Sequence, residues 1–446
     1  MTIMKRTILF VSLLLSALVP LQAQRLFKVE QPQFEEFFKD ARTAIYFYRE
    51  GNRQNERVYL RSDKAPIVNM DPRVSGGWAG SKTQLLDPVD NGDYRLMLVD
   101  EASGREIYSR TFNNLFHEYR DTPAGKDSVA RFEEVMYIPT PKRSALLCLQ
   151  RRDDKQRFFT EATFHLDSYA STTDSKRPYV VRKLQYKGEP SKKIDVVIIG
   201  EGYGIKDRKK YEQDLQNFKE YLFASEPFKS RRDDFNVWAV EAFAKESGIT
   251  DPTKDKYVNS VCGSSYNTFG IARYLMTMEV FKMHSYLRYV PFDHILIMAN
   301  SETYGGGGIY NFYSMTATVD MARYVLPHEL GHSIGGLADE YVDTQVSYND
   351  MHKEGWEPVE PNITSLVDFD SKWKDMLPAN AAIPTPACMD AVKFTENCGE
   401  LGVYEGGGYK PKGIYRPMFN CMMNYYAPFC PVCQRALNFM FDLYTR

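Results

Sequence analysis

The N-terminal part of the chain alternates between hydrophobic and polar residues with a period of two. Short runs of this kind, typical of β-strands, occur at 44–49, 57–61, 94–99, 105–112, 134–138 and 145–149. Asn91-Gly92 and Ser103-Gly104 supply turn signals between such runs. Regularly spaced short strands favour a β-sandwich, which we assign to residues 24–180 as an accessory domain. Residues 170–187, at the end of this domain and the beginning of the next, are polar and are interpreted as a linker.

The pattern changes at about residue 181, where longer apolar runs begin. Continuous apolar segments at 193–200, 235–243 and 294–298 predict buried strands, and helical spacing at 207–223 and 271–283 predicts helices between them. Strands that alternate with helices are typical of an α/β domain, which we assign to residues 181–446. The fold class predicted for the whole chain is therefore α+β and multidomain.

The first 23 residues have the features of a secretory signal peptide. Lys5 and Arg6 precede an apolar run of 12 residues at 8–19, and Leu21-Gln22-Ala23 places a small residue before a cleavage point. The run is too short for a bilayer, which needs roughly 20 apolar residues, and no other stretch approaches that length. We therefore expect an exported protein, periplasmic, at the cell surface or secreted, without a membrane span.

Charge narrows the range of partners. Lys and Arg number 56 against 58 Asp and Glu, so the chain lacks the basic excess that nucleic-acid binding requires. We expect no nucleic-acid partner, and the oligomeric state stays open. The seven cysteines are expected to pair in part in an oxidising compartment, in a connectivity that the sequence does not give.

One motif carries chemistry: His328-Glu329-Leu330-Gly331-His332, an H-E-x-x-H sequence. A spacing of four on a helix places both imidazoles on one face, where both can bind one Zn²⁺ ion. Glu329 between them is placed to take a proton from a metal-activated water. The alternative is an amphipathic helix with two surface histidines. We predict Zn²⁺ as cofactor, His328 and His332 as ligands and Glu329 as the catalytic base.

A third ligand must come from the chain beyond the helix. Gly335-Gly336 can end the helix and turn the chain back toward the metal. In the metzincin pattern H-E-x-x-H-x-x-G-x-x-H, Gly335 takes the glycine position, but Ala338 takes the ligand position and cannot bind. Asp339, one residue later, is the predicted third ligand, with Glu340 as the alternative. Glutamates at 354, 357 and 360 are more distant candidates, disfavoured by the neighbouring prolines.

Two further segments bear on the site. Met422 or Met423 fits the methionine turn that metzincins place beneath the zinc. Cys430 and Cys433 are candidates for a redox pair, half of a zinc knuckle or disulfide anchors. The absence of a second C-x-x-C disfavours the knuckle and the absence of a thioredoxin-like context disfavours the redox pair, so disulfides are favoured. Four consecutive glycines within 304–311 indicate either a cleft-lining segment or a plain flexible loop.

These motifs resemble the immunoglobulin A peptidase family of zinc metallopeptidases. The resemblance rests on the His328–His332 motif with Asp339-Glu340-Tyr341, on Glu405-Gly406-x-x-Tyr409, and on Cys421-Met422-Met423 with the cysteine pair that follows. It covers residues 185–446 most clearly. It implies a metzincin-like zinc endopeptidase domain behind an accessory domain.

The predicted function is therefore hydrolysis of peptide bonds in a protein or glycoprotein substrate. The family name implies immunoglobulin A, although no residue of this chain specifies that substrate over other host glycoproteins. The alternative is a non-catalytic surface protein that binds glycans or proteins through its β-domain.

Overall fold

The structure is a computed structural model that describes residues 30–153, 155–174, 179–343, 352–386 and 399–446. The segment predicted as a signal peptide, 1–23, lies outside these ranges. Within them, every helix falls short of the length and apolarity needed to cross a bilayer.

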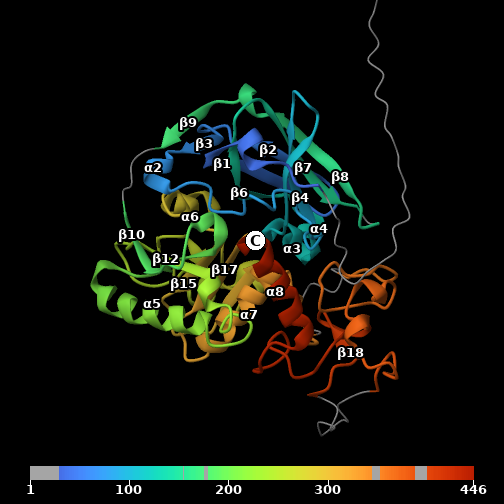
Figure 1. The fold of residues 1–446 in the computed structure, drawn as a ribbon. Coiled ribbons are helices and arrows are strands. Elements are labelled where there is room, and N and C mark those ends of the chain that lie inside the picture. Colours follow the sequence, from blue (N-terminus) through green and yellow to red (C-terminus); the bar gives the residue numbers. More distant parts are fainter. Residues whose placement is uncertain (1–29, 154, 175–178, 344–351, 387–398) are drawn as a thin grey trace, which may run out of the picture.

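Two β-sheets form the N-terminal region, in the upper half of Figure 1. The first has the order β2-β1-β3-β9, with β6 also paired to β1, and the second has the order β5-β4-β7-β8. Their strands are β1 (Phe38–Gly51), β2 (Glu56–Leu60), β3 (Ile67–Met70), β4 (Tyr94–Asp100), β5 (Glu106–Phe112), β6 (Ala130–Pro141), β7 (Ala145–Arg152), β8 (Phe158–His165) and β9 (Ser171–Asp174).

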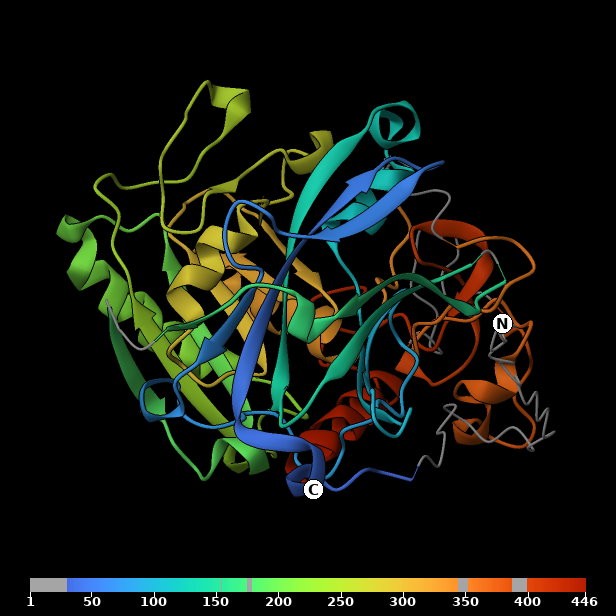
Figure 2. The same cartoon turned by 90° about the horizontal axis from the view of Figure 1, so that it is seen from above.

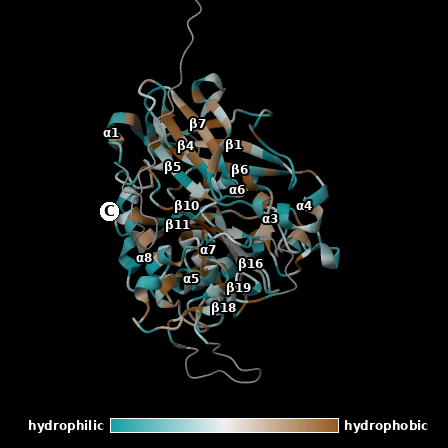
Figure 3. Cartoon of the chain, turned by 90° about the vertical axis from the view of Figure 1, so that its right-hand side faces the viewer, coloured by the Kyte–Doolittle hydropathy of each residue, from teal (hydrophilic) through white to brown (hydrophobic). Residues whose placement is uncertain are grey.

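Apolar side chains from both sheets fill one shared core. Ile45 and Phe47 of β1 meet Leu96 of β4 and Leu147 of β7 there, each less than one-tenth exposed. Figure 3 shows the corresponding hydrophobic colouring along β1, β4 and β7. Short helices connect the strands: α1 (Phe34–Phe37), α2 (Pro72–Ser75), α3 (Leu115–Asp121) and α4 (Pro123–Asp127).

A six-stranded sheet organises the second region, in the order β10-β12-β11-β15-β17-β16. Its strands are β10 (Val180–Gln185), β11 (Ile194–Glu201), β12 (Phe235–Glu241), β15 (His294–Ala299), β16 (Gly306–Ile309) and β17 (Tyr313–Ala317). The central strand β11 runs parallel to β12 and β15 and is buried along its whole length, as its continuous apolar sequence predicts.

The two faces of this sheet are covered by different partners. Val196 and Ile198 point to a core shared with α5 (Arg208–Leu222), α7 (Ala322–Gly335) and α8 (Pro431–Thr445). Val197 and Ile199 point to a second core, shared with α6 (Val280–Leu287) and with β1 of the N-terminal region. The first N-terminal sheet therefore covers one face of the second region, as the view from above shows (Figure 2).

Two small hairpins complete the fold. They are β13 (Ser264–Ser265) with β14 (Met276–Thr277), and β18 (Tyr404–Gly407) with β19 (Lys410–Arg416).

Two predicted elements are wrong. The presumed linker at 170–187 contains β9, which joins the first sheet, and β10, which joins the six-stranded sheet. The helix predicted at 271–283 begins only at Val280, since Met276–Thr277 forms β14. The Thr277 hydroxyl donates to the carbonyl of Cys262, and its amide donates to the hydroxyl of Tyr313, so neighbouring segments hold this residue outside the helix.

Candidate metal centre

Helix α7 carries the H-E-x-x-H motif and ends where the glycines predict. Gly336 has a φ of 60°, in the left-handed region. Its amide donates to the carbonyl of His332, and the amide of Leu337 donates to Gly331. The bond from the left-handed residue Gly336 to His332 is the αL motif, which satisfies one of the last carbonyls of the helix and reverses the chain. Pro327 lies inside the helix, five residues after its first residue Ala322.

The reversal brings Asp339 to the two histidines. Its Oδ1 lies 3.1 Å from Nε2 of His328 and 3.4 Å from Nε2 of His332, and the two Nε2 atoms lie 3.2 Å apart. Three donor atoms from one helix and its return segment therefore converge on one point. The histidine side chains remain 20% and 16% exposed, whereas Asp339 is 5% exposed. The group is therefore open to solvent on the side formed by His328 and His332.

Both imidazoles are fixed through their other nitrogen. Nδ1 of His328 donates to the carbonyl of Met422 at 2.9 Å, and Nδ1 of His332 donates to the carbonyl of Leu337 at 2.6 Å. Because a carbonyl can only accept, each Nδ1 carries the hydrogen, and each Nε2 presents a lone pair to the convergence point when the ring is neutral.

A strained hairpin holds the other oxygen of Asp339. The hydroxyl of Tyr409 donates to Oδ2, and the amide of Gly408 donates to the Asp339 carbonyl at 2.8 Å. Gly408 and Tyr409 connect β18 to β19, and both have positive φ, 53° and 66°. A two-residue turn with positive φ at both positions normally carries Asn or Gly, so Tyr409 has a strained backbone conformation. This conformation places its hydroxyl against the carboxylate of Asp339.

Glu329 lies on the same helix and faces strand β16. Its side chain lies within the same group of potential metal donors as His328 and His332, and the residue is 9% exposed. The glycines of β16 allow this close approach, since a Cβ at Gly308 would lie 2.3 Å from the carbonyl oxygen of Glu329. The glycine run is therefore a strand packed on the helix and lining the cleft, rather than a plain loop.

The charges of the group are strongly coupled. Burial lowers the pKa of His332, but Asp339 and Glu329 outweigh burial and raise it to about 9, and the pKa of His328 is raised for the same reason. Burial raises the pKa of Asp339, yet the two histidines bring it far below its usual range. Burial also raises the pKa of Glu329. The group thus concentrates negative charge beside two imidazoles, as a cation site does.

The segment with Met422 and Met423 lies beneath the helix. The Met422 carbonyl holds His328, and the Met423 carbonyl accepts the amide of Glu340 at 2.7 Å. The sulfur of Met423 packs under Gly331, where a Cβ would lie 2.8 Å from it. Both methionines therefore support the site, one through its backbone and the other through its side chain.

Glu340 points away from the histidines. It accepts a hydrogen bond from Nδ2 of Asn362 at 2.9 Å and lies beside the thiol of Cys433. The more distant candidates have other partners: Glu357 accepts from Ser365 and from the amide of Asp368, and Glu354 is exposed. Glu360 lies at the cleft, 4.0 Å from His352. Of the candidates, Asp339 is the one that the fold brings against both Nε2 atoms.

A cleft of about 730 Å³ opens above the convergence point. The second region supplies most of its lining, including Arg273, Tyr304 and Tyr425. The N-terminal region contributes His117 and Glu118 of α3, and the carboxylate of Glu118 accepts a hydrogen bond from the Tyr274 hydroxyl at 2.5 Å.

The sequence pattern missed these two residues as part of the site. A residue of α3 gives no sign in the sequence of which distant cleft it reaches. The role of Tyr409 beside Asp339 was likewise not predicted.

Comparison with protein families completes the description. No curated protein shows a significant match to the chain. The model of the family described as IgA Peptidase M64 matches residues 182–400 and 387–441, and the model described as Peptidase M64 N-terminus matches residues 33–163. The first match covers nearly all of the six-stranded sheet and the histidine motif, and the second covers the two N-terminal sheets except β9 and the end of β8. The resemblance inferred from the motifs is confirmed: the chain belongs to the IgA peptidase M64 family of metallopeptidases, with an N-terminal domain followed by a peptidase domain.

Proposed function

We propose that this peptidase is an exported zinc endopeptidase in which His328, His332 and Asp339 hold Zn²⁺ and Glu329 is the general base. One observation carries the proposal: Oδ1 of Asp339 is buried between two imidazole Nε2 atoms and has no hydrogen-bond partner among the described residues. A buried carboxylate oxygen without a partner is costly, and a cation at this point would satisfy it.

The donor set fits zinc. Two imidazole nitrogens and one carboxylate oxygen are borderline ligands of the kind that Zn²⁺ prefers, and three protein ligands leave a position open, as in catalytic zinc sites. When bound, the ion supplies Lewis acidity, which activates a water and polarises the scissile carbonyl.

The residues of the chain perform the proton transfers. Glu329 takes a proton from the attacking water and passes it to the leaving amine. Its burial raises its pKa, which makes the carboxylate a stronger base than an exposed glutamate. The carbonyls of Met422 and Leu337 keep both imidazoles in the tautomer that leaves Nε2 free. Tyr409 fixes the plane of the Asp339 carboxylate.

The cleft fits an extended protein substrate. Strand β16 is at the edge of its sheet, beside Glu329, and an extended chain can pair with such an edge. Tyr274 already pairs with Gly306 of β16, so a substrate chain would pair with the residues of β16 that follow Gly306. We propose a protein or glycoprotein substrate, with immunoglobulin A as the first one to test because the family description names it.

The metzincin-like character rests on the left-handed turn at Gly336, the return segment and the methionines beneath the histidines. Export rests on the predicted signal peptide. In this proposal, the chain is exported first, the signal peptide is removed, and the mature chain then cleaves its substrate.

Substitution of Glu329 by Gln tests the mechanism. The variant keeps the shape of the side chain and loses the base, so we expect zinc content near that of the wild type and peptide cleavage lower by roughly 10²–10⁴-fold. Zinc analysis and a cleavage assay on immunoglobulin A and a generic protein substrate measure both. The exposed Glu302→Gln is the matched control and should keep full activity. Full activity of Glu329→Gln would refute the proposed role of this residue.

A further inference from the structure

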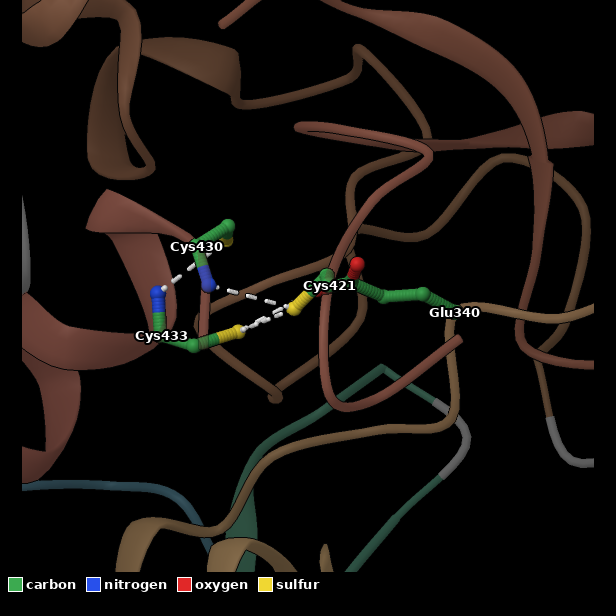
Figure 4. A group of neighbouring side chains, drawn as sticks. All are labelled: Glu340, Cys421, Cys430 and Cys433. Atoms are coloured by element: carbon green, nitrogen blue, oxygen red, sulfur yellow. Dashed lines mark hydrogen bonds between the residues drawn. The ribbon is translucent and has the colours of Figure 1, made fainter. Parts of the chain in front are cut away.

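A second group of potential metal donors lies on the other side of the return segment. The carboxylate of Glu340 and the thiols of Cys421, Cys430 and Cys433 place one donor atom each within 4.8 Å of all the others. The four residues are 0–2% exposed. Figure 4 shows them drawn together from three segments: the chain after α7, the turn before α8, and the first turn of α8.

The distances fit metal coordination rather than a disulfide. Sγ of Cys421 lies 3.6 Å from Sγ of Cys433, and Sγ of Cys433 lies 3.2 Å from Oε1 of Glu340. Zinc–sulfur bonds of about 2.3 Å in a tetrahedron place two sulfurs about 3.8 Å apart. A disulfide would require about 2.05 Å. All five cysteines among the described residues are free thiols, so the disulfide expected for Cys430 or Cys433 is not found.

The carboxylate gives a second, independent indication. Oε2 of Glu340 is buried and has no hydrogen-bond partner among the described residues, while Asn362 holds Oε1. Main-chain amides also point at the sulfurs: that of Cys430 toward Cys421 at 3.4 Å, and that of Cys433 toward Cys430 at 3.5 Å. Amides directed at sulfur favour the thiolate form that a metal requires.

We propose that Glu340, Cys421, Cys430 and Cys433 bind a second Zn²⁺ ion, which is structural. Three thiolates with one carboxylate are a soft donor set that selects zinc over magnesium or calcium. Four protein donors in a buried position leave no place for water, which is the arrangement of a structural site. Each thiol that binds releases its proton to solvent. This inference does not depend on the peptidase mechanism.

The position of the group gives this metal a role. Glu340 directly follows Asp339, and Cys421 directly precedes Met422, whose carbonyl holds His328. A metal here would tie together the return segment, the methionine turn and the beginning of α8. It would therefore fix the elements that position the first site without taking part in catalysis.

Metal content tests the proposal in the full mature chain, purified under reducing conditions with ZnSO₄ present. We expect about two zinc ions per chain in the wild type and about one in His332→Ala, which disables only the first site. Cys421→Ser/Cys433→Ser should retain about one. The matched control is Cys262→Ser, because Cys262 is an equally buried thiol outside the group, and it should keep both ions.

Cobalt distinguishes the two sites by a signal other than activity. His332→Ala loaded with Co²⁺ should show thiolate-to-metal charge-transfer absorption, which imidazole and carboxylate ligands do not produce. The cysteine double variant should lack it. Persistence of the absorption in the double variant would overturn the proposal.

A measurement on the unmodified chain covers the case in which the double variant does not fold. Peptide mapping after alkylation should find Cys421, Cys430 and Cys433 protected by zinc and modified at least about ten times faster once a chelator removes it. A mapped disulfide among these three residues, or alkylation rates that ignore the chelator, would refute the site.

Discussion

The two donor groups on either side of Asp339 and Glu340 differ in access and in chemistry, although one peptide bond separates their carboxylates. The group of His328, His332 and Asp339 has nitrogen and oxygen donors and opens to the cleft. The group of Glu340 and the cysteines has mainly sulfur donors and is closed to solvent. A site that opens to solvent and leaves one coordination position free suits catalysis, whereas a buried site with four protein ligands suits a structural metal.

The alternation of side chains along an extended segment explains this division. Residues 337–340 have no helical structure, and successive side chains of an extended chain point to opposite sides. Asn362 keeps the segment in register by bonding both the amide and the carbonyl of Ala338. A shift of one residue would exchange Asp339 and Glu340, so the register of this segment decides which carboxylate faces the histidines.

The largest expected effect comes from substituting the two carboxylates, Asp339 and Glu340, one at a time. Asp339→Ala should weaken zinc binding at the histidine site by more than about 100-fold and abolish cleavage, since it removes a direct ligand. Glu340→Gln, which retains an oxygen for Asn362, should keep the zinc at the histidine site and instead weaken Co²⁺ binding at the cysteine group, so that the thiolate–cobalt absorption needs a higher Co²⁺ concentration than in the wild type. Site-resolved metal titration with Co²⁺ checks both variants. The reverse pattern would mean that Glu340 is the ligand and that the inferred register is wrong.

A smaller effect is expected from the hydroxyl that holds Asp339. Tyr409→Phe removes one hydrogen bond to Oδ2 and should weaken zinc binding by roughly 10–100-fold, the range for outer partners of metal ligands. Competition with a chelator measures the affinity. Tyr404→Phe is the control from the same hairpin, because its hydroxyl bonds the carbonyl of Glu400. Equal affinities in the two variants would show that Tyr409 does not support the ligand.

The smallest effect concerns a buried histidine outside the two proposed metal sites. Burial lowers the pKa of His294 to about 3. The pKa of His332 is shifted in the opposite direction, because Asp339 and Glu329 lie beside it. The unfolded state binds the proton of His294 below about pH 6.5 and the folded state does not, so stability is lost as the pH falls from about 6.5 toward 3. The loss between pH 8 and pH 5 is about 2 kcal/mol for a histidine of this kind.

His294→Phe should therefore reduce the fall in unfolding free energy between pH 8 and pH 5 by about 2 kcal/mol, measured by urea titration at both values. The wild type, measured at the same two pH values, provides the reference. The same pH dependence in His294→Phe as in the wild type would contradict the buried, neutral state of His294.

Strong periodicity made much of the fold predictable. The apolar run at 193–200 corresponds to β11 and the helical stretch at 207–223 to α5, because each is buried on a face that its pattern already marks. Strands β8, β9 and β10 were missed because they are largely exposed or half-exposed and carry little apolar alternation.

The site was predictable where local geometry alone decides it. A helix fixes the relation of His328 to His332, and Gly335-Gly336 marks the turn that follows. The support of the site was not predictable, since Tyr409, Asn362 and Glu118 reach it from distant segments through tertiary packing. The same limit applies to Cys421, which the pattern could not join to Cys430, Cys433 and Glu340.

The core beneath the six-stranded sheet belongs to both regions of the chain. Ala44 and Tyr46 of β1 share it with Val197 and Ile199 of β11 and with Leu287 of α6. The N-terminal region therefore packs directly on one face of the peptidase sheet. The same packing brings His117 and Glu118 to the cleft. Without the N-terminal region, the apolar residues that β1 covers on this face of the sheet would be exposed to water, so the stability of the peptidase region depends on the N-terminal region.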